Sequence, residues 1–343
     1  MAVTFLSDLG VNLPVLAAPM AGGPGTAALV TAAARAGSLG FVAAGYKSPQ
    51  ALAEEITAVA GTGLPFGVNL FAPNPQPIDP VDFRTYAGVI APEAERYGVS
   101  LDGDKPREDD DSWQEKLEVL RAHPVPLISF TFGIPAARDL AALRATGALL
   151  IQTVTSAEEA AAAADAGVDA LAVQSAQAGG HFGTLTPSRP AAESPLAEVV
   201  AAVHRSVDLP LIATGGLATP ADVAGVMHAG ASAVAVGTVL LRSDEAGTTA
   251  AHRAALADPA RESVRTRAFT GRPARGLRNE FIERYECQAP LGYPAVHYLT
   301  SPLRKAAAAA GDPERVHLWA GIGFRHATDE PAAAILTRLA GQL

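Results

Sequence analysis

Short runs of apolar, often β-branched residues recur along the chain, and alanine-rich stretches with the apolar spacing of helices separate them. Eight runs predict strands: Val15 to Pro19, Gly40 to Ala44, Phe66 to Leu70, Leu127 to Thr131, Leu149 to Thr153, Ala170 to Gln174, Leu211 to Thr214 and Ala233 to Val236. Strands that alternate with helices are typical of parallel βαβ units. Eight such units predict an α/β fold, a (β/α)8 TIM barrel.

Two of the intervening helices carry clear start and stop signals. Ser156 precedes AEEAAAAADAG, in which acidic residues occupy the first turn and Gly167 follows the last. Thr219 precedes Pro220 at the first helical position, and Gly230 ends the same segment. These residues predict helix boundaries and no chemistry.

Two long segments exceed a minimal barrel, and both are expected to belong to one domain that spans residues 1–343. The first, at about 72–125, lies between the third and fourth predicted strands and contains the acidic run Asp109 to Asp111. Because loops that follow barrel strands lie on the catalytic face, we expect it to border the site, with its acidic run solvated. The second, at about 244–343, is rich in arginine and aromatic residues and predicts a helical C-terminal extension over the top and side of the barrel.

Composition excludes several classes of partner. The chain has 343 residues, 49% of them hydrophobic, and a net charge of −9 with no run of Lys or Arg, so nucleic acid and anionic membrane are not predicted. The beginning, MAVTFLSDLG, lacks the pattern of a secretory signal, and no apolar stretch is long enough to span a bilayer. We therefore expect a cytoplasmic protein. The single Cys287 excludes an intrachain disulfide and a cysteine-cluster metal site.

The segment ALAVQSAQAGGHFG holds the strongest candidate for chemistry, because Gly179 and Gly180 follow a predicted strand and directly precede His181. Glycines adopt backbone angles that other residues avoid and let a flat ligand approach the main chain. The end of a barrel strand is also where a catalytic base is presented. A histidine that is only hydrogen-bonded or solvated in a glycine turn has the same short motif, so the motif alone leaves both interpretations open.

The last two predicted strands end in turns suited to phosphate. Gly215 and Gly216 follow the seventh strand, and Gly237 and Thr238 follow the eighth. Barrels commonly bind phosphate with these two loops, through backbone N–H groups and a helix N-terminus. Glycine lets the main chain approach the phosphate, and a threonine hydroxyl adds a donor. The alternative is that the glycines only permit tight turns.

Other strand ends carry amides and no pair of carboxylates. Asn69, Gln152 and Gln174 lie in or at the end of the third, fifth and sixth strands, and the first strand ends in AAPMAGG. An amide both donates and accepts, which suits the edge of a flavin ring, so redox chemistry is favoured over hydrolysis by paired carboxylates. No metal site is predicted, because His181, His204 and His228 lack ligand spacing with acidic partners; the last two are expected to be structural helix residues.

Seven segments in a fixed order resemble one enzyme family: AAPMAGGPGTAALVTAAARAGSLGFV, PFGVNLF, QSAQAGGHFGT, PLIATGGLATPADV, AVAVGTVLL, HYLTSPLRKAA and LWAGIGF. Together they are similar to the FMN-dependent nitronate monooxygenases, formerly called 2-nitropropane dioxygenases. By this resemblance His181 is the catalytic residue. The candidate FMN-binding residues, from strand ends and resemblance together, are Ala18, Pro19, Met20, Asn69, Gln152, Gln174, Gly179, Gly180, Gly215, Gly216, Gly237 and Thr238.

The chain departs from the family pattern at three positions. Ser175 and Gln177 stand where a glycine and a glutamate are usual, and Ile322 stands where a glutamine is expected. The loss of a carboxylate and an amide near the site is expected to change the pKa of His181 or the substrate pocket.

The resemblance implies FMN-dependent oxidation of alkyl nitronates or nitroalkanes by O2 to a carbonyl compound and nitrite. Neutral His181 would remove the proton beside the nitro group, or its imidazolium would pair with a preformed nitronate. Two alternatives stay open: an NAD(P)H-dependent flavin reductase for enoyl thioesters or quinones, and a barrel that binds FMN or a phosphate without catalysis. The oligomeric state is also left open.

Overall fold

The barrel contains all eight strands that the sequence predicts. The computed structural model describes residues 4–189 and 193–343. The strands are β1 (Val15–Ala17), β2 (Phe41–Ala43), β3 (Gly67–Phe71), β4 (Leu127–Thr131), β5 (Leu149–Val154), β6 (Ala170–Gln174), β8 (Leu211–Thr214) and β9 (Ala233–Val236). All pair in parallel in the order β1-β9-β8-β6-β5-β4-β3-β2, and a bridge between Ala17 and Gly40 joins the two end strands. The predicted TIM barrel is confirmed.

Eight helices surround the strands: α2 (Ala27–Arg35), α3 (Pro49–Ala60), α5 (Trp113–Ala122), α6 (Ala137–Arg144), α7 (Ala157–Asp165), α8 (Leu196–His204), α9 (Pro220–His228) and α13 (Ala332–Leu339). The predicted starts are confirmed, since Ser156 caps α7 through the Glu159 N–H and Thr219 forms a capping box with Asp222 on α9. His204 and His228 lie on the last turns of α8 and α9, as expected.

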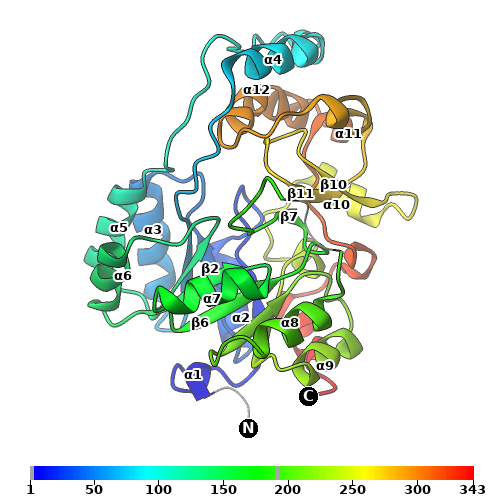
Figure 1. Cartoon of the computed structure of the whole chain (residues 1–343). Helices are drawn as coiled ribbons and strands as arrows, with labels where there is room; N and C mark the ends of the chain where they lie inside the picture. Colours follow the sequence, from blue (N-terminus) through cyan, green and yellow to red (C-terminus); the bar gives the residue numbers. More distant parts are fainter. Residues whose placement is uncertain (1–3, 190–192) are drawn as a thin grey trace.

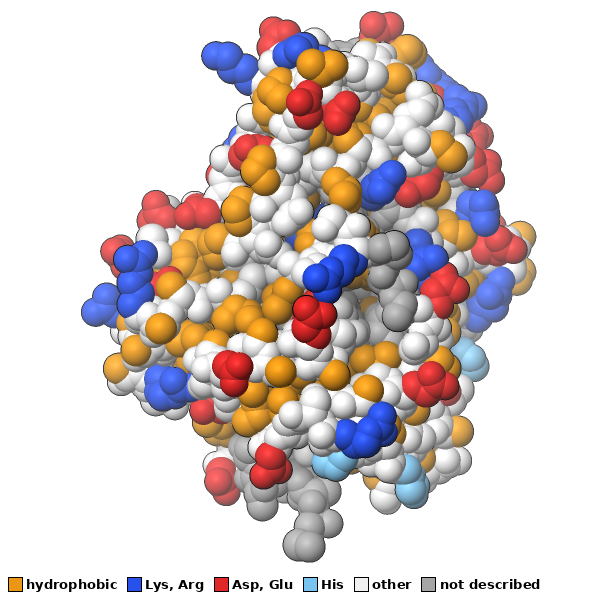
Figure 2. All heavy atoms as spheres, in the orientation of Figure 1, with side chains coloured by type: hydrophobic (Ala, Val, Ile, Leu, Met, Phe, Trp, Pro, Cys, Tyr) orange, Lys and Arg blue, Asp and Glu red, His pale blue; other side chains and the backbone are white. Residues whose placement is uncertain are grey.

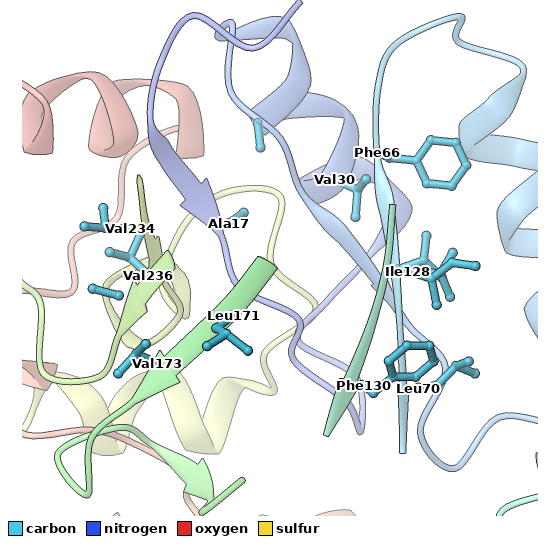
Figure 3. Close-up of a cluster of buried hydrophobic side chains, with 14 of the residues drawn as sticks. Ala17, Val30, Phe66, Leu70, Ile128, Phe130, Leu171, Val173, Val234 and Val236 are labelled. Carbon is cyan, nitrogen blue, oxygen red and sulfur yellow. The ribbon is translucent and has the colours of Figure 1, made fainter. Parts of the chain in front are cut away.

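The hydrophobic core has two layers because successive strand residues face opposite sides. One layer lies between strands and helices and includes Leu70, Ile128 and Phe130; Figure 3 shows side chains of this layer. The other contains Leu16 and Ile151 and fills the interior of the barrel. Leu6 of the short helix α1 (Thr4–Ser7) joins this inner layer, among other residues. The inner layer does not fill the carboxyl ends of the strands, and this end of the barrel is where a site can form.

The segment between β3 and β4 adds one helix beyond the barrel, α4 (Pro80–Glu95), while α5 takes the place of the barrel helix. Figure 1 shows α4 at the end of the molecule opposite α1, beside α12 (Ala295–Ala309). Phe83 and Ile90 of α4 pack in one hydrophobic cluster with residues of α12. Glu93 anchors the same helix through an ion pair of 3.0 Å with the buried Arg315.

The segment after β9 is an insertion rather than a purely terminal extension, which refines the prediction for 244–343. It contains α10 (Ala250–Ala257), β10 (Ser263–Thr266), β11 (Ala274–Leu277), α11 (Glu280–Tyr285), α12 and the 3-10 turns η1 (Thr238–Leu240), η2 (Glu286–Gln288), η3 (Pro313–Arg315) and η4 (Phe324–His326). The chain then returns as α13, whose Ile335 and Leu336 are buried in the outer layer of the barrel. The eighth barrel helix is therefore α13, about ninety residues after its strand.

A second, three-stranded sheet connects this insertion to the barrel. The short strand β7 (Gly180–His181) pairs antiparallel with β11, and β11 pairs with β10. His181 lies opposite Ala274 in this register. The sequence predicted only helices here, and the added hairpin fixes the backbone of the glycine-histidine segment from above the barrel.

The outer surface carries mixed charge. On the face drawn in Figure 2, acidic and basic side chains are interspersed and gather in no large patch of one sign. Among the residues that the structure describes, no helix is both long and apolar enough to cross a membrane.

Candidate functional site

A cavity of about 1390 Å³ opens at the carboxyl ends of the barrel strands, between the barrel and the two insertions. Twelve of the thirteen residues proposed from the sequence line it: Ala18, Pro19, Met20, Asn69, Gln174, Gly179, Gly180, His181, Gly215, Gly216, Gly237 and Thr238. Residues spread over more than two hundred positions of the chain thus surround one space. The volume is larger than the roughly 300–1,000 Å³ of a typical single-ligand pocket, so the cavity has room for a cofactor together with a small substrate.

Gln152 is the exception, and the prediction that it contacts a flavin is wrong. Along β5 the side chains of Leu150 and Val154 belong to the layer beneath the helices, whereas those of Ile151 and Thr153 line the cavity. Gln152 therefore faces the helices, is fully buried, and donates to the Thr153 carbonyl at 3.0 Å. The cause is the two-residue period of a strand.

His181 reaches the cavity inside a ring of aromatic side chains. Its ring centroid lies 5.7 Å from that of Phe132, 5.4 Å from that of Tyr293 and 5.4 Å from that of Trp319. Burial, with a smaller contribution from the charges of Arg272 and Arg304, lowers the pKa of His181 from 6.5 to about 3. The imidazole is therefore neutral at neutral pH and can accept a proton.

A threonine orients this imidazole. Nε2 of His181 lies 2.9 Å from Oγ1 of Thr270, and the Thr270 hydroxyl donates to the Arg272 carbonyl at 3.3 Å. This 2.9 Å contact positions the ring, and a neutral imidazole keeps one nitrogen lone pair whichever of the two groups donates.

The glycine turn after β8 has a left-handed backbone, whereas Gly237 after β9 has a φ of −119°. Gly215 and Gly216 have φ values of +109° and +81°, which L side chains rarely adopt. A Cβ at Gly179 would lie 2.6 Å from the Gly321 nitrogen, so the loop after β6 is pressed against the segment LWAGIGF. The Gly321 N–H donates to Oγ1 of Thr238 at 3.0 Å, which leaves the proton of that hydroxyl for a ligand.

Two amides are held by the barrel in fixed orientations. Asn69 donates to Oγ of Ser129 at 2.9 Å and to Oγ1 of Thr131 at 3.1 Å, so its carbonyl oxygen remains for a ligand. Oε1 of Gln174 accepts the Gly183 N–H at 2.7 Å. Fixed amides of this kind suit the polar edge of a flat heterocycle.

The three departures from the family pattern lie together on the side of the glycine turns. The hydroxyl of Ser175 donates to the Gly215 carbonyl at 3.4 Å, and the N–H of Ile322 donates to the Gln177 carbonyl at 3.2 Å. Ile322 is 44% exposed. Burial and then the charges of Arg272 and Arg304 lower the pKa of His181, and the expected effect of the three departures on it stays a prediction.

The acidic run of the first insertion is only partly solvated. Asp110 is exposed, but Asp111 forms an ion pair of 2.6 Å with the buried Lys116 and accepts the Tyr46 N–H at 3.1 Å. The expectation of a solvated run is therefore wrong for Asp111. This carboxylate holds Tyr46, which lines the cavity with a φ of +67°, in a strained left-handed conformation.

Several site residues were not proposed from the sequence, although their segment was noted as rich in arginine and aromatics. They form the wall contributed by the second insertion and the residues that support it: Thr270, Arg272, Tyr293, His297, Arg304, His317 and Trp319. Tyr46 stacks on His297 with centroids 4.2 Å apart and planes 2° apart, which joins the β2–α3 loop to this wall. Only the folded chain brings these rings beside His181.

No set of three or more His, Cys, Asp or Glu suited to a metal ion occurs within residues 4–189 and 193–343. The site offers instead a neutral imidazole, two amides, glycine turns and buried guanidinium groups. These groups bind an anionic or flat ligand and take up a proton.

Comparison with known proteins points to one family. The nitronate monooxygenase profile matches residues 4–340. The "Probable nitronate monooxygenase" of Staphylococcus aureus strain Newman is 34% identical over 346 residues, which cover 98% of this chain and 95% of that protein. A crystal structure of nitroalkane oxidase from Streptomyces ansochromogenes has a TM-score of 0.90 and 44% identity over 98% of this chain and 97% of its own. FabK from Thermotoga maritima, at 24% identity over 100% and 96% of the chains and a TM-score of 0.76, shares the fold.

Proposed function

Because the chain belongs to the nitronate monooxygenase family, whose members are oxidoreductases, we propose that it oxidises nitronates with FMN and O2 to a carbonyl compound and nitrite. Its substrates would be alkyl nitronates such as propionate 3-nitronate, and neutral nitroalkanes as well. The observation that carries the proposal is the neutral His181 in one cavity with two glycine turns after the last strands.

The residues of the cavity fit FMN. Gly215 and Gly216 have left-handed backbones packed against Ser175 and Gln177, so no side chain fits there, and their main chain would bind the phosphate together with Thr238, which retains a hydroxyl proton for it. Asn69 and Gln174 supply the polar groups for the ring, whereas the ends of β1 and β9 are apolar around Met20. When bound, FMN supplies redox chemistry toward both the nitronate and O2.

His181 would act as the general base for a neutral nitroalkane. Such a substrate has an acidic carbon beside the nitro group, and the imidazole nitrogen that carries no proton would take its proton. Phe132, Tyr293 and Trp319 exclude water around the ring and keep the base neutral. A substrate that arrives as a nitronate has already lost this proton, so it needs only to be bound and oriented.

Spectra and oxygen uptake of the full-length protein test the proposal. The purified or FMN-reconstituted protein is expected to be yellow and to consume O2 and release nitrite with propionate 3-nitronate. Under anaerobic mixing, the nitronate is expected to bleach the yellow colour and NADH to leave it. Prompt bleaching by NADH with none by nitronate would instead favour the reductase chemistry, and a protein that cannot be reconstituted with FMN would contradict the cofactor.

A substitution tests the base itself. His181→Asn is expected to lower kcat/KM for a neutral nitroalkane by about 10² to 10⁴, the usual contribution of a general base. Turnover of the preformed nitronate should fall much less, because no proton is removed. His204→Asn, on the exposed end of α8, serves as the matched control. Unchanged turnover of the neutral substrate by the His181 variant would refute the assignment.

A further inference from the structure

Two buried guanidinium groups lie in or behind the wall of the cavity, and within the described residues neither has a carboxylate among its hydrogen-bond partners. Arg272 is 0% exposed and donates to the Phe182 and Thr184 carbonyls at 3.3 and 2.6 Å. Arg304 is 5% exposed. Buried arginines are normally paired with an acid, because an uncompensated charge in a low-dielectric interior is strongly unfavourable.

Arg304 is the one of the two that lines the cavity. Arg272 is covered on the cavity side, since its guanidinium carbon lies 4.0 Å from the centroid of the Phe132 ring. The two arginines therefore differ in what they can reach. A ligand in the cavity could contact Arg304, whereas Arg272 could act only by its charge at a distance.

Neutral groups hold Arg304 in place and leave its charge uncompensated. Its Nε donates to Oγ1 of Thr300 at 3.0 Å, and its Nη2 donates to the His297 carbonyl at 2.8 Å. Its Nη1 contacts only the ring of His317, with Nδ1 at 3.1 Å, so one N–H of this nitrogen has no partner. Burial first, then the charge of Arg304, lowers the pKa of both histidines, so they are neutral and add no second positive charge.

We propose that Arg304 is the specificity-determining residue that makes this cavity prefer anionic substrates, so that a nitronate binds more tightly than the neutral nitroalkane of the same skeleton. The inference rests on the proposed function and names the charge state of its substrate. A bound anion would supply the counter-charge that the protein omits. Attraction between opposite charges is stronger here than at the surface, because the wall of aromatic rings excludes water.

Nitrate is a direct probe, because it is a planar anion of nearly the same shape as the smallest nitronate, while nitromethane is its neutral counterpart. Calorimetric titration of the FMN-loaded full chain should show that nitrate binds and competes with propionate 3-nitronate. Arg304→Met should weaken nitrate about 10- to 100-fold, as expected for the loss of a charged hydrogen-bond partner, and leave nitromethane unchanged. Arg304→Lys should retain most of the affinity, because it keeps the charge.

Two further variants separate specificity from folding and from general charge. Arg304→Gln keeps a hydrogen-bonding group toward Thr300 and replaces the methionine variant if that one does not fold. Arg205→Met removes one positive charge from an exposed position at the end of α8, outside the cavity lining, and should change nitrate affinity less than about twofold because solvent screens that position.

Each outcome decides the inference. Nitrate affinity that is equal in wild type and in a folded Arg304→Met or Arg304→Gln variant would overturn it, as would an equal loss in Arg205→Met. Failure of the wild type to bind nitrate while it still oxidises nitronate would overturn the role of Arg304 and leave the proposed function intact. Absence of nitronate turnover in the wild type would instead contradict the proposed function.

Discussion

Because His252 is buried, we expect the protein to lose stability in mild acid. The residue lies on α10, is 8% exposed, and its Nε2 has no hydrogen-bond partner within the described residues. Burial lowers its pKa from 6.5 to about 4 in the folded protein. The unfolded chain therefore binds a proton between pH 6.5 and 4 that the folded protein does not, so stability falls as the pH is lowered through this window.

The magnitude follows from the two pKa values. At pH 5 the imidazole of the unfolded chain is protonated and that of the folded protein is not. Each unit of pH below 6.5 changes the free energy of unfolding by about 1.4 kcal/mol, so His252 alone destabilises the protein by about 2 kcal/mol at pH 5 relative to pH 7.5. Burial also lowers the pKa values of His181, His297 and His317, so these residues act in the same direction.

Urea unfolding at pH 7.5 and 5.0, at a fixed FMN concentration, measures this effect. The free energy of unfolding should fall by more than 2 kcal/mol in the wild type, and in His252→Gln the fall should be smaller by about 2 kcal/mol. His204→Gln, at an exposed position, should behave as the wild type does. A wild-type stability that is equal at the two pH values would refute the reasoning, and so would a His252→Gln variant with an unchanged pH dependence.

Three other substitutions test the architecture of the site. Asp111→Asn should lower the free energy of unfolding by about 3 kcal/mol, because it leaves the buried Lys116 unpaired; urea titration measures this, with the exposed Asp110→Asn as control. Thr270→Val should lower kcat/KM for a neutral nitroalkane about tenfold, because His181 loses the hydrogen bond that positions its ring, and Thr270→Ser should restore the rate. Gly179→Ala should release FMN during gel filtration, detected by loss of visible absorbance, because the new methyl group has no room.

The strands could be predicted because each is a short apolar run between turn signals, and the structure places all eight within about two residues of the prediction. The site glycines could be predicted for the same reason, since they follow directly after those strands. The orientation of Gln152 could also be predicted. It lies on the same face of β5 as Leu150 and Val154, and this face points away from the cavity.

Long-range partners could not be predicted in this way. The sequence of α13 shows an amphipathic helix, but not that it returns across a long insertion to complete the barrel. Asp111 looks like its neighbour Asp110, and only the buried Lys116 distinguishes them. Local patterns describe how a segment is built, whereas such contacts depend on chain segments that meet only after folding.

The groups proposed to hold FMN and the groups proposed to act on the substrate come from different parts of the fold. The barrel strands supply the groups proposed to hold FMN, and these depend on backbone shape and strand register. The proposed base and the proposed anion-binding charge come from elsewhere: β11 holds the backbone of His181, and α12 carries Arg304. Asp111 and Tyr46 connect the first insertion to the same wall through the stack on His297. Changes in the insertions can therefore alter which substrate binds while the barrel keeps its hydrogen bonds, so variants of Arg304 should change substrate preference at constant FMN affinity.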